Sequence, residues 1–94
     1  MNIQSLIREN KGNIIDVRTR QEFSGGHVAG SKNIPLNELP GQLEELKKLE
    51  GPLVVCCASG MRSRQAEYFL NQHGIECYDG GSWLQVNFVQ SKSA

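Results

Sequence analysis

The chain has 94 residues, of which 38% are hydrophobic and 21% charged, a composition that fits one folded domain and is too apolar for a disordered chain. Ten Lys and Arg balance ten Asp and Glu, so the charge pattern provides no broad basic field for nucleic acid or for an anionic membrane. The sequence also has no apolar run with the length of a secretory signal or a membrane span, which predicts a cytoplasmic protein.

Three short apolar runs predict β-strands, in chain order at residues 13–17 (NIIDV), 52–56 (PLVVC) and 75–79 (IECYD). None of the three shows a clean alternation of apolar and polar residues, and this is typical of strands that are buried on both faces. We therefore expect a sheet that is covered by other elements on both sides.

A first helix is predicted ahead of the second strand, where leucines recur at spacings of four, three and three: Leu39, Leu43, Leu46 and Leu49. Glu44 and Lys48 lie four residues apart on its wetter side and are expected to pair. Gly51 and Pro52 end this helix.

A second helix is predicted to open near Arg62 or Ser63 and to close at Gly74, which can adopt the left-handed conformation of a helix end. Its inward-facing residues are Ala66, Phe69 and Leu70.

Because strands alternate with helices, the pattern predicts an α/β domain with a largely parallel sheet. The chain has no internal repeat, and its polar end at residues 91–94 is expected to fray.

The stretch VVCCASGMRS, residues 54–63, crosses from the second strand into the second helix and can carry chemistry. Backbone N–H groups at a helix N-terminus have no partner inside the helix, so they form a cup for an anion and stabilise a cysteine thiolate there. Gly60 allows a tight turn beside the sulfur, and Ser63 is expected to cap the helix.

Two adjacent cysteines compete for this role. Counted from Cys56, the loop reads C-x5-R, the spacing of a cysteine phosphatase; counted from Cys57, it reads C-x4-R-S and is one residue shorter. Cys56 continues the apolar run and is expected to remain in the strand, and Cys77 is expected to pack in the core. The chain has three cysteines, an odd number, and lacks a C-x-x-C pair or a His cluster. We therefore expect neither a disulfide framework nor a structural metal, and at least one free thiol.

These residues resemble the signatures of a known family. The pattern C-x-S-G-x-R-S is matched from Cys57 to Ser63, the stretch IIDVRTRQEFSGGHVAGSKNIPL at residues 14–36 is similar to an upstream signature, and YDGGSW at residues 78–83 is similar to a Gly-Gly turn followed by Trp. The chain thus resembles a single-domain rhodanese, a member of the sulfurtransferase family, over about residues 13–85.

The resemblance implies a rhodanese-like α/β fold with a mainly parallel central sheet of about five strands and helices on both faces, formed by residues 1–90 as one domain. It selects Cys57 as the catalytic residue, which would carry sulfur as a persulfide. The substrate-binding residues that it implies form the rest of the loop: Ala58, Ser59, Gly60, Met61, Arg62 and Ser63.

The same resemblance implies a two-step transfer of sulfur from thiosulfate or a persulfide donor to a thiol, a protein or cyanide. It implies no cofactor and no metal. From the balanced charge we expect no nucleic-acid or membrane partner, and we expect a monomer. Thiosulfate-specific members resemble loops with basic residues after the cysteine, whereas this loop has Ala58 and Ser59, which favours a persulfide donor.

The upstream signature receives a structural interpretation. Asp16, Arg18 and Glu22 are expected to form a hydrogen-bonded cluster that ties the first strand to the next helix. His27 is assigned to structure because a nucleophile that is already a thiolate needs no general base, and Trp83 is assigned to the core. Two alternatives remain: a phosphatase or arsenate-reducing relative of the same fold, and a regulatory module without catalysis, which the presence of Cys57 disfavours.

Overall fold

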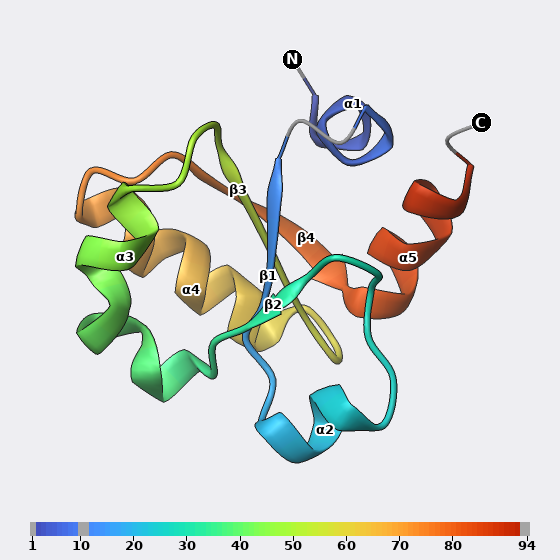
Figure 1. Ribbon diagram of the computed structural model, residues 1–94, viewed down its shortest axis with the longest axis horizontal. Coiled ribbons are helices and arrows are strands. Elements are labelled where there is room, and N and C mark those ends of the chain that lie inside the picture. The colour runs from blue at the N-terminus through green and yellow to red at the C-terminus, as the bar shows by residue number, and fades with distance from the viewer. Residues whose placement is uncertain (1, 10–11, 93–94) are drawn as a thin grey trace.

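The computed structural model describes residues 2–9 and 12–92 and contains a parallel sheet between two layers of helices (Figure 1). In chain order its elements are α1 (Ile3–Arg8), β1 (Asn13–Asp16), α2 (Arg20–Ser24), β2 (Lys32–Asn33), the 3-10 helix η1 (Leu36–Gln42), α3 (Leu43–Lys47), β3 (Leu53–Cys57), α4 (Met61–Gln72), β4 (Cys77–Ser82) and α5 (Trp83–Ser91).

The sheet has the strand order β2-β1-β3-β4, and each of its pairings is parallel. The prediction of an α/β fold with a parallel sheet is confirmed, with four strands in the described residues where about five were expected. At the β4 edge, the backbone N–H groups of Cys77 and Asp79 donate to the side chains of Asn71 (3.1 Å) and Glu67 (3.0 Å). Side chains of α4 thus take donors that a further strand would otherwise use.

The two faces of the sheet carry two separate apolar clusters, because successive side chains of a strand point to opposite faces. One cluster joins β1 and β3 to η1, α3 and α4 through Ile15, Leu53, Val55, Leu70 and other residues. The other joins the same strands to α1 and α5 through Leu6, Ile14, Val54 and Val86, among others. Helices cover both faces, as predicted, with α3 and α4 on one side and α1 and α5 on the other (Figure 1).

The two predicted helices form with shifted ends. The first begins as the 3-10 helix η1, which contains Pro40, and becomes α-helical only at Leu43. Proline has no N–H to donate, and this disfavours a regular α-helix through that position. Lys48 pairs with Glu45 at 3.6 Å, so the expected pairing with Glu44 is wrong.

The second predicted helix, α4, begins at Met61, and Gly74 follows it with a φ of 80°. Ala66 and Leu70 are fully buried in it, and Phe69 packs at the margin of the same cluster. The prediction of this helix and of its left-handed glycine is therefore confirmed.

Three short helices were not predicted: α1, α2 and α5. Isolated helices of this length are marginal in water, so packing rather than intrinsic propensity decides whether they form.

Ser91, the first residue of the predicted frayed end, is the last residue of α5, and residues 93 and 94 lie outside the described part. Within residues 2–9 and 12–92, no helix combines the length and the apolar character needed to cross a lipid bilayer.

Candidate active site

The two adjacent cysteines point to opposite faces of the sheet. Cys57 is the last residue of β3, one residue beyond the predicted strand end, and it belongs to the cluster under α4. Cys56 belongs to the cluster under α1 and α5. The strand's period of two residues therefore places one sulfur beside the start of α4 and turns the other away from it.

The Cys57 sulfur lies inside the turn that leads into α4. The N–H of Gly60 approaches Sγ at 2.9 Å, and the N–H of Ser63 approaches it at 3.4 Å. Gly60 has a φ of 100°, a conformation that residues with a side chain rarely adopt, and this turn aims its N–H at the sulfur. The loop therefore forms the predicted cup of backbone donors.

This environment separates Cys57 from the other two thiols. Burial alone would raise the pKa of Cys57, but its contacts with the side chain and backbone of Ser63 and with the backbone of Gly60 and Ser59 lower it below its ordinary value. Burial raises the pKa of both Cys56 and Cys77 to about 12, and all three cysteines are free. Cys57 is thus the thiol that the fold prepares as a thiolate.

Ser63 does not cap α4, contrary to the prediction. The N-cap residue is Gly60, and Ser63 is buried in the first helical turn. Its Oγ lies 3.5 Å from the Cys57 sulfur, 3.1 Å from the Gly60 carbonyl oxygen and 2.6 Å from Oδ1 of Asp79. Asp79 was not predicted at the site, although its position before the Gly-Gly turn of YDGGSW, at the end of a strand, could have indicated it.

Arg62 was expected among the substrate-binding residues of the loop, and its side chain has a carboxylate partner. Its Nη1 and Nη2 donate to the two carboxylate oxygens of Glu22 at 2.7 Å and 3.1 Å. The Arg62 bonds, with a further bond from the Thr19 backbone, lower the pKa of Glu22 to about 2. This ion pair joins α2 to the start of α4, since Glu22 also completes the capping box of α2 with Thr19.

Comparison with known proteins identifies the fold that carries this site. A family model described as a rhodanese-like domain matches residues 3–83. The chain belongs to the rhodanese-like domain family.

Individual relatives agree with this assignment. The chain is 37% identical over 78 residues to the thiosulfate sulfurtransferase GlpE of Pseudomonas aeruginosa, a match that covers 80% of this chain and 70% of the relative. It is 32% identical over 101 residues to the human thiosulfate:glutathione sulfurtransferase, with 88% of each covered. It is 38% identical over 64 residues to the uncharacterized protein YqhL of Bacillus subtilis and spans only 50% of that relative's length.

A solved structure shows the same architecture. The rhodanese-related protein of Thermoplasma volcanium superposes with a TM-score of 0.77 at 31% identity, and the match covers 89% of this chain and 83% of the other.

The upstream signature of this rhodanese domain forms the cluster that was predicted. Arg18 donates to both carboxylate oxygens of Asp16, at 2.7 Å to 3.0 Å, and to the carbonyl oxygen of Gly26 at 2.7 Å. Glu22 contributes only its carbonyl oxygen, at 3.4 Å, because its carboxylate is held by Arg62. The predicted cluster of Asp16, Arg18 and Glu22 is therefore confirmed, with Glu22 joining it through its backbone.

His27 and Trp83 have structural surroundings in the rhodanese domain. The His27 ring stacks on Phe23 with a centroid distance of 3.7 Å, and its Nδ1 lies 2.8 Å from the Phe23 carbonyl oxygen. Trp83 packs against the cluster under α5 and lies under the Arg18 guanidinium. Both contacts fit the structural roles that were assigned from the sequence.

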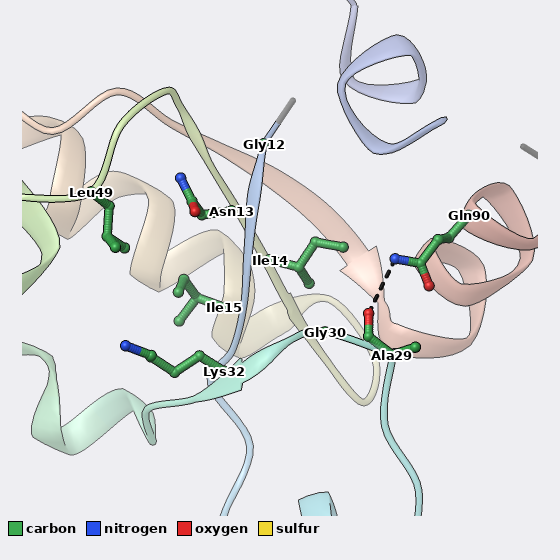
Figure 2. A pocket seen from close by; sticks show the side chains of 9 residues that line it. All are labelled: Gly12, Asn13, Ile14, Ile15, Ala29, Gly30, Lys32, Leu49 and Gln90. Atoms are coloured by element: carbon green, nitrogen blue, oxygen red, sulfur yellow. Dashed lines mark hydrogen bonds between the residues drawn. The ribbon is translucent and has the colours of Figure 1, made fainter. Parts of the chain in front are cut away.

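A shallow depression borders the loop, and a second one lies along β1. The first is lined by Ser59, Gly60, Met61, Arg64, Gln65, Asp79 and Gly81. The second runs beside β2, and Figure 2 shows Gln90, one of its lining residues, donating to the carbonyl oxygen of Ala29. Cys57 belongs to neither lining, but Gly60 and Asp79 place the first depression next to its sulfur. We therefore take the first depression as the approach to the site.

Proposed function

We propose that the protein is a sulfurtransferase that carries a sulfane sulfur as a persulfide on Cys57. The observation that carries this proposal is the position of the Cys57 sulfur, which the N–H groups of Gly60 and Ser63 approach at 2.9 Å and 3.4 Å. The same donors can stabilise the negative charge on the thiolate and on the outer sulfur of the persulfide. The names of the GlpE and human relatives support the same activity.

The cycle has two steps. The Cys57 thiolate attacks the outer sulfur of the donor, a new S–S bond forms, and the donor's bond to that sulfur breaks with its electron pair left on sulfite or on a thiolate. An acceptor thiolate or cyanide then attacks the outer sulfur of the persulfide, and Cys57 leaves as a thiolate. In each step the nucleophile supplies the electron pair of the new bond and the leaving group keeps that of the broken bond, so the proposed cycle uses no oxidant, no metal and no organic cofactor.

The loop binds the donor mainly through its backbone. Gly60 and Ser63 point N–H groups at the sulfur, and Ser59 contributes a further backbone bond to it. Ala58, Ser59 and Met61 are exposed at the loop surface, so their side chains are available to an approaching donor or acceptor. Arg62 ties the start of α4 to α2 through Glu22.

The donor that we favour is a persulfide rather than thiosulfate. Thiosulfate is a dianion, and the positions after the cysteine carry Ala58 and Ser59. The charge of Arg62 is offset by the Glu22 carboxylate at 2.7 Å, which weakens its attraction for a second anion. A thiol is the acceptor that we favour, by similarity to the relative named as a thiosulfate:glutathione sulfurtransferase.

The phosphatase frame is less well supported. It would use Cys56, whose sulfur lies on the opposite face of the sheet and whose pKa burial raises to about 12. A thiol in that state is a poor nucleophile at neutral pH. We therefore propose the shorter loop frame, which begins at Cys57.

We also propose a cytoplasmic location and activity as a monomer. Three free cysteines suit a reducing compartment, in which thiols are not driven to form disulfides. Every group that the cycle needs comes from a single chain, so a second copy is not required to complete the site.

The experiment that tests the function compares two matched serine variants. After incubation with thiosulfate or glutathione persulfide, mass spectrometry of the intact wild-type protein should show one added sulfur. Cys57→Ser should lose both this adduct and sulfur transfer to cyanide, whereas Cys56→Ser should keep most of each. Loss of transfer only in Cys56→Ser, or no adduct on the wild type, would overturn the proposal.

A further inference from the structure

The Ser63 hydroxyl has one proton and three neighbours that could share it. Oγ lies 2.6 Å from Oδ1 of Asp79, 3.1 Å from the Gly60 carbonyl oxygen and 3.5 Å from the Cys57 sulfur. A hydrogen bond from a hydroxyl to a carboxylate at this short distance is of the strong, charge-assisted kind. The Ser63 hydroxyl therefore donates its hydrogen bond to Asp79. A lone pair of Oγ remains, and the Cys57 thiol can donate to it.

Asp79 is held in place to make this bond. The N–H of Gly81 donates to the same Oδ1 at 2.9 Å, and the N–H of Asp79 itself donates to Glu67 at 3.0 Å. Gly81 has a φ of 81°, which turns the chain back toward the carboxylate at the end of β4. The direction of the Ser63 hydroxyl is thus set by the Gly-Gly turn, and not by the catalytic loop alone.

We propose that Asp79 is a positioning residue that holds the Ser63 proton away from the Cys57 sulfur, and this inference rests on the proposed sulfurtransferase function. The N–H groups of Gly60 and Ser63, at 2.9 Å and 3.4 Å from the sulfur, then stabilise the thiolate, while the Ser63 hydroxyl stays with the carboxylate at 2.6 Å. A thiolate with one donor fewer is a stronger nucleophile and a poorer leaving group, because both properties follow the basicity of the sulfur. Asp79 therefore favours sulfur uptake from the donor over sulfur release to the acceptor.

Other ionisable groups surround this pair and must be kept constant. Asp16 at the end of β1 and Arg18 just after it interact with Cys56, which interacts with Cys57 in turn. Arg62 interacts with Cys57 from α4. Arg64 and Glu67 flank Asp79 from α4. Asp79→Asn leaves all of them unchanged and keeps an oxygen that can accept from Gly81 and Ser63. The amide is neutral, so the Ser63 proton can turn to the thiolate.

The first test titrates the Cys57 thiolate by its ultraviolet absorbance, which requires no turnover. Cys56 and Cys77 ionise only near pH 12 and do not interfere. Asp79→Asn should lower the pKa of Cys57 by about one unit, the order of one hydrogen bond to a charged group. The same substitution in a Ser63→Ala background should have a much smaller effect, because the hydroxyl that transmits it is absent.

Two controls make the titration decisive. Ser63→Ala alone should not raise the pKa of Cys57, whereas it would do so if the hydroxyl donated to the thiolate in the wild type. Glu67→Gln, which changes a carboxylate beside Asp79 that does not touch Ser63, should leave the pKa of Cys57 unchanged. A rise in Ser63→Ala, or equal shifts from Asp79→Asn in both backgrounds, would overturn the inference.

The second test separates the two half-reactions at a pH where Cys57 is fully ionised in every variant. Asp79→Asn should slow persulfide formation and speed sulfur release to a thiol, each about threefold for one unit of pKa. A merely structural role for Asp79 would slow both steps, and that result would overturn the inference. If the wild type forms no persulfide while the titration behaves as expected, the proposed function is wrong and the role of Asp79 in directing the Ser63 proton stands.

Discussion

At the scale of single residues, this site shows how two identical neighbours acquire opposite chemistry. Cys56 and Cys57 are both fully buried, yet the pKa of the first is raised to about 12 and that of the second is lowered. Burial opposes ionisation of both thiols, and only Cys57 receives N–H donors from the turn into α4. The face of the sheet toward which each side chain points, rather than its exposure, distinguishes the two sulfurs.

The Arg62–Glu22 pair gives a prediction on pH dependence at the same scale. The pKa of Glu22 is lowered from 4.5 to about 2, so the pair stabilises the folded state above about pH 4.5 and loses that contribution as the pH falls toward 2. At neutral pH, Glu22→Gln should lower the free energy of unfolding by about 0.2–1 kcal/mol, since the pair is one-third exposed. Urea denaturation at several pH values should show this difference shrinking toward pH 2.

Glu44→Gln, on the exposed side of α3, is the matched control and should leave the pH profile unchanged. Gln is also tolerated in a capping box, so the substitution in Glu22 keeps the start of α2. A difference between wild type and Glu22→Gln that stays constant down to pH 2 would contradict the role given to the ion pair.

At the scale of elements, β4 packs closely against β3 and α5 at Gly80, the residue after Asp79. A Cβ at Gly80 would stand 2.8 Å from Cγ2 of Val86 in α5 and 2.9 Å from Cγ1 of Val54 in β3. Such distances are below any normal contact, so the second cluster closes only because residue 80 has no side chain. The Gly-Gly turn therefore serves packing at Gly80 and carboxylate orientation at Gly81.

We predict that Gly80→Ala destabilises the protein by about 1–3 kcal/mol, the usual cost of forcing extra volume into a packed core. Gly41→Ala in η1 is the control, because a Cβ there would meet nothing within 4 Å. Thermal unfolding should show a lower Tm for Gly80→Ala and an almost unchanged Tm for Gly41→Ala. Equal Tm values for Gly80→Ala and the wild type would show that α5 can shift freely on the sheet.

At the scale of the whole molecule, the Asp16–Arg18 pair joins segments that are distant in sequence. Asp16 ends β1, and the Arg18 guanidinium reaches the Gly26 carbonyl oxygen and lies over the Trp83 ring at 4.8 Å. Arg18 is 4% exposed and Asp16 is completely buried. The pair thus ties β1, the segment after α2 and the start of α5 together near the carboxyl end of the sheet.

Removal of one partner of this pair should therefore affect the whole fold. Asp16→Ala leaves the buried Arg18 charge without its carboxylate, and we predict a loss of about 3–5 kcal/mol in the free energy of unfolding. Arg20→Ala, which removes an exposed partner of Glu38, should cost less than about 1 kcal/mol. Chemical denaturation measures both values. A loss in Asp16→Ala as small as that in Arg20→Ala would contradict the structural role of the cluster.

The sequence was most informative where the pattern is local. Apolar runs predicted β1, β3 and β4, the spacing of Ala66 and Leu70 predicted α4, and the loop pattern predicted a cup of donors at Gly60. It was least informative for α1, α2 and α5, whose short lengths make their formation depend on the sheet against which they pack. The resemblance in motifs supplied the family before any contact was known, and the match over residues 3–83 confirms it.

The sequence by itself determined the α/β class, the family and the loop on which the cysteine lies, because each depends on neighbours within a few positions or on short motifs. Only the tertiary structure decided the partners of the side chains in that loop. Arg62 bonds Glu22, 40 positions away, and Ser63 bonds Asp79, 16 positions away. Such pairs form because parallel strands bring their carboxyl ends to one edge of the sheet, and separation along the chain does not reveal which side chains meet there.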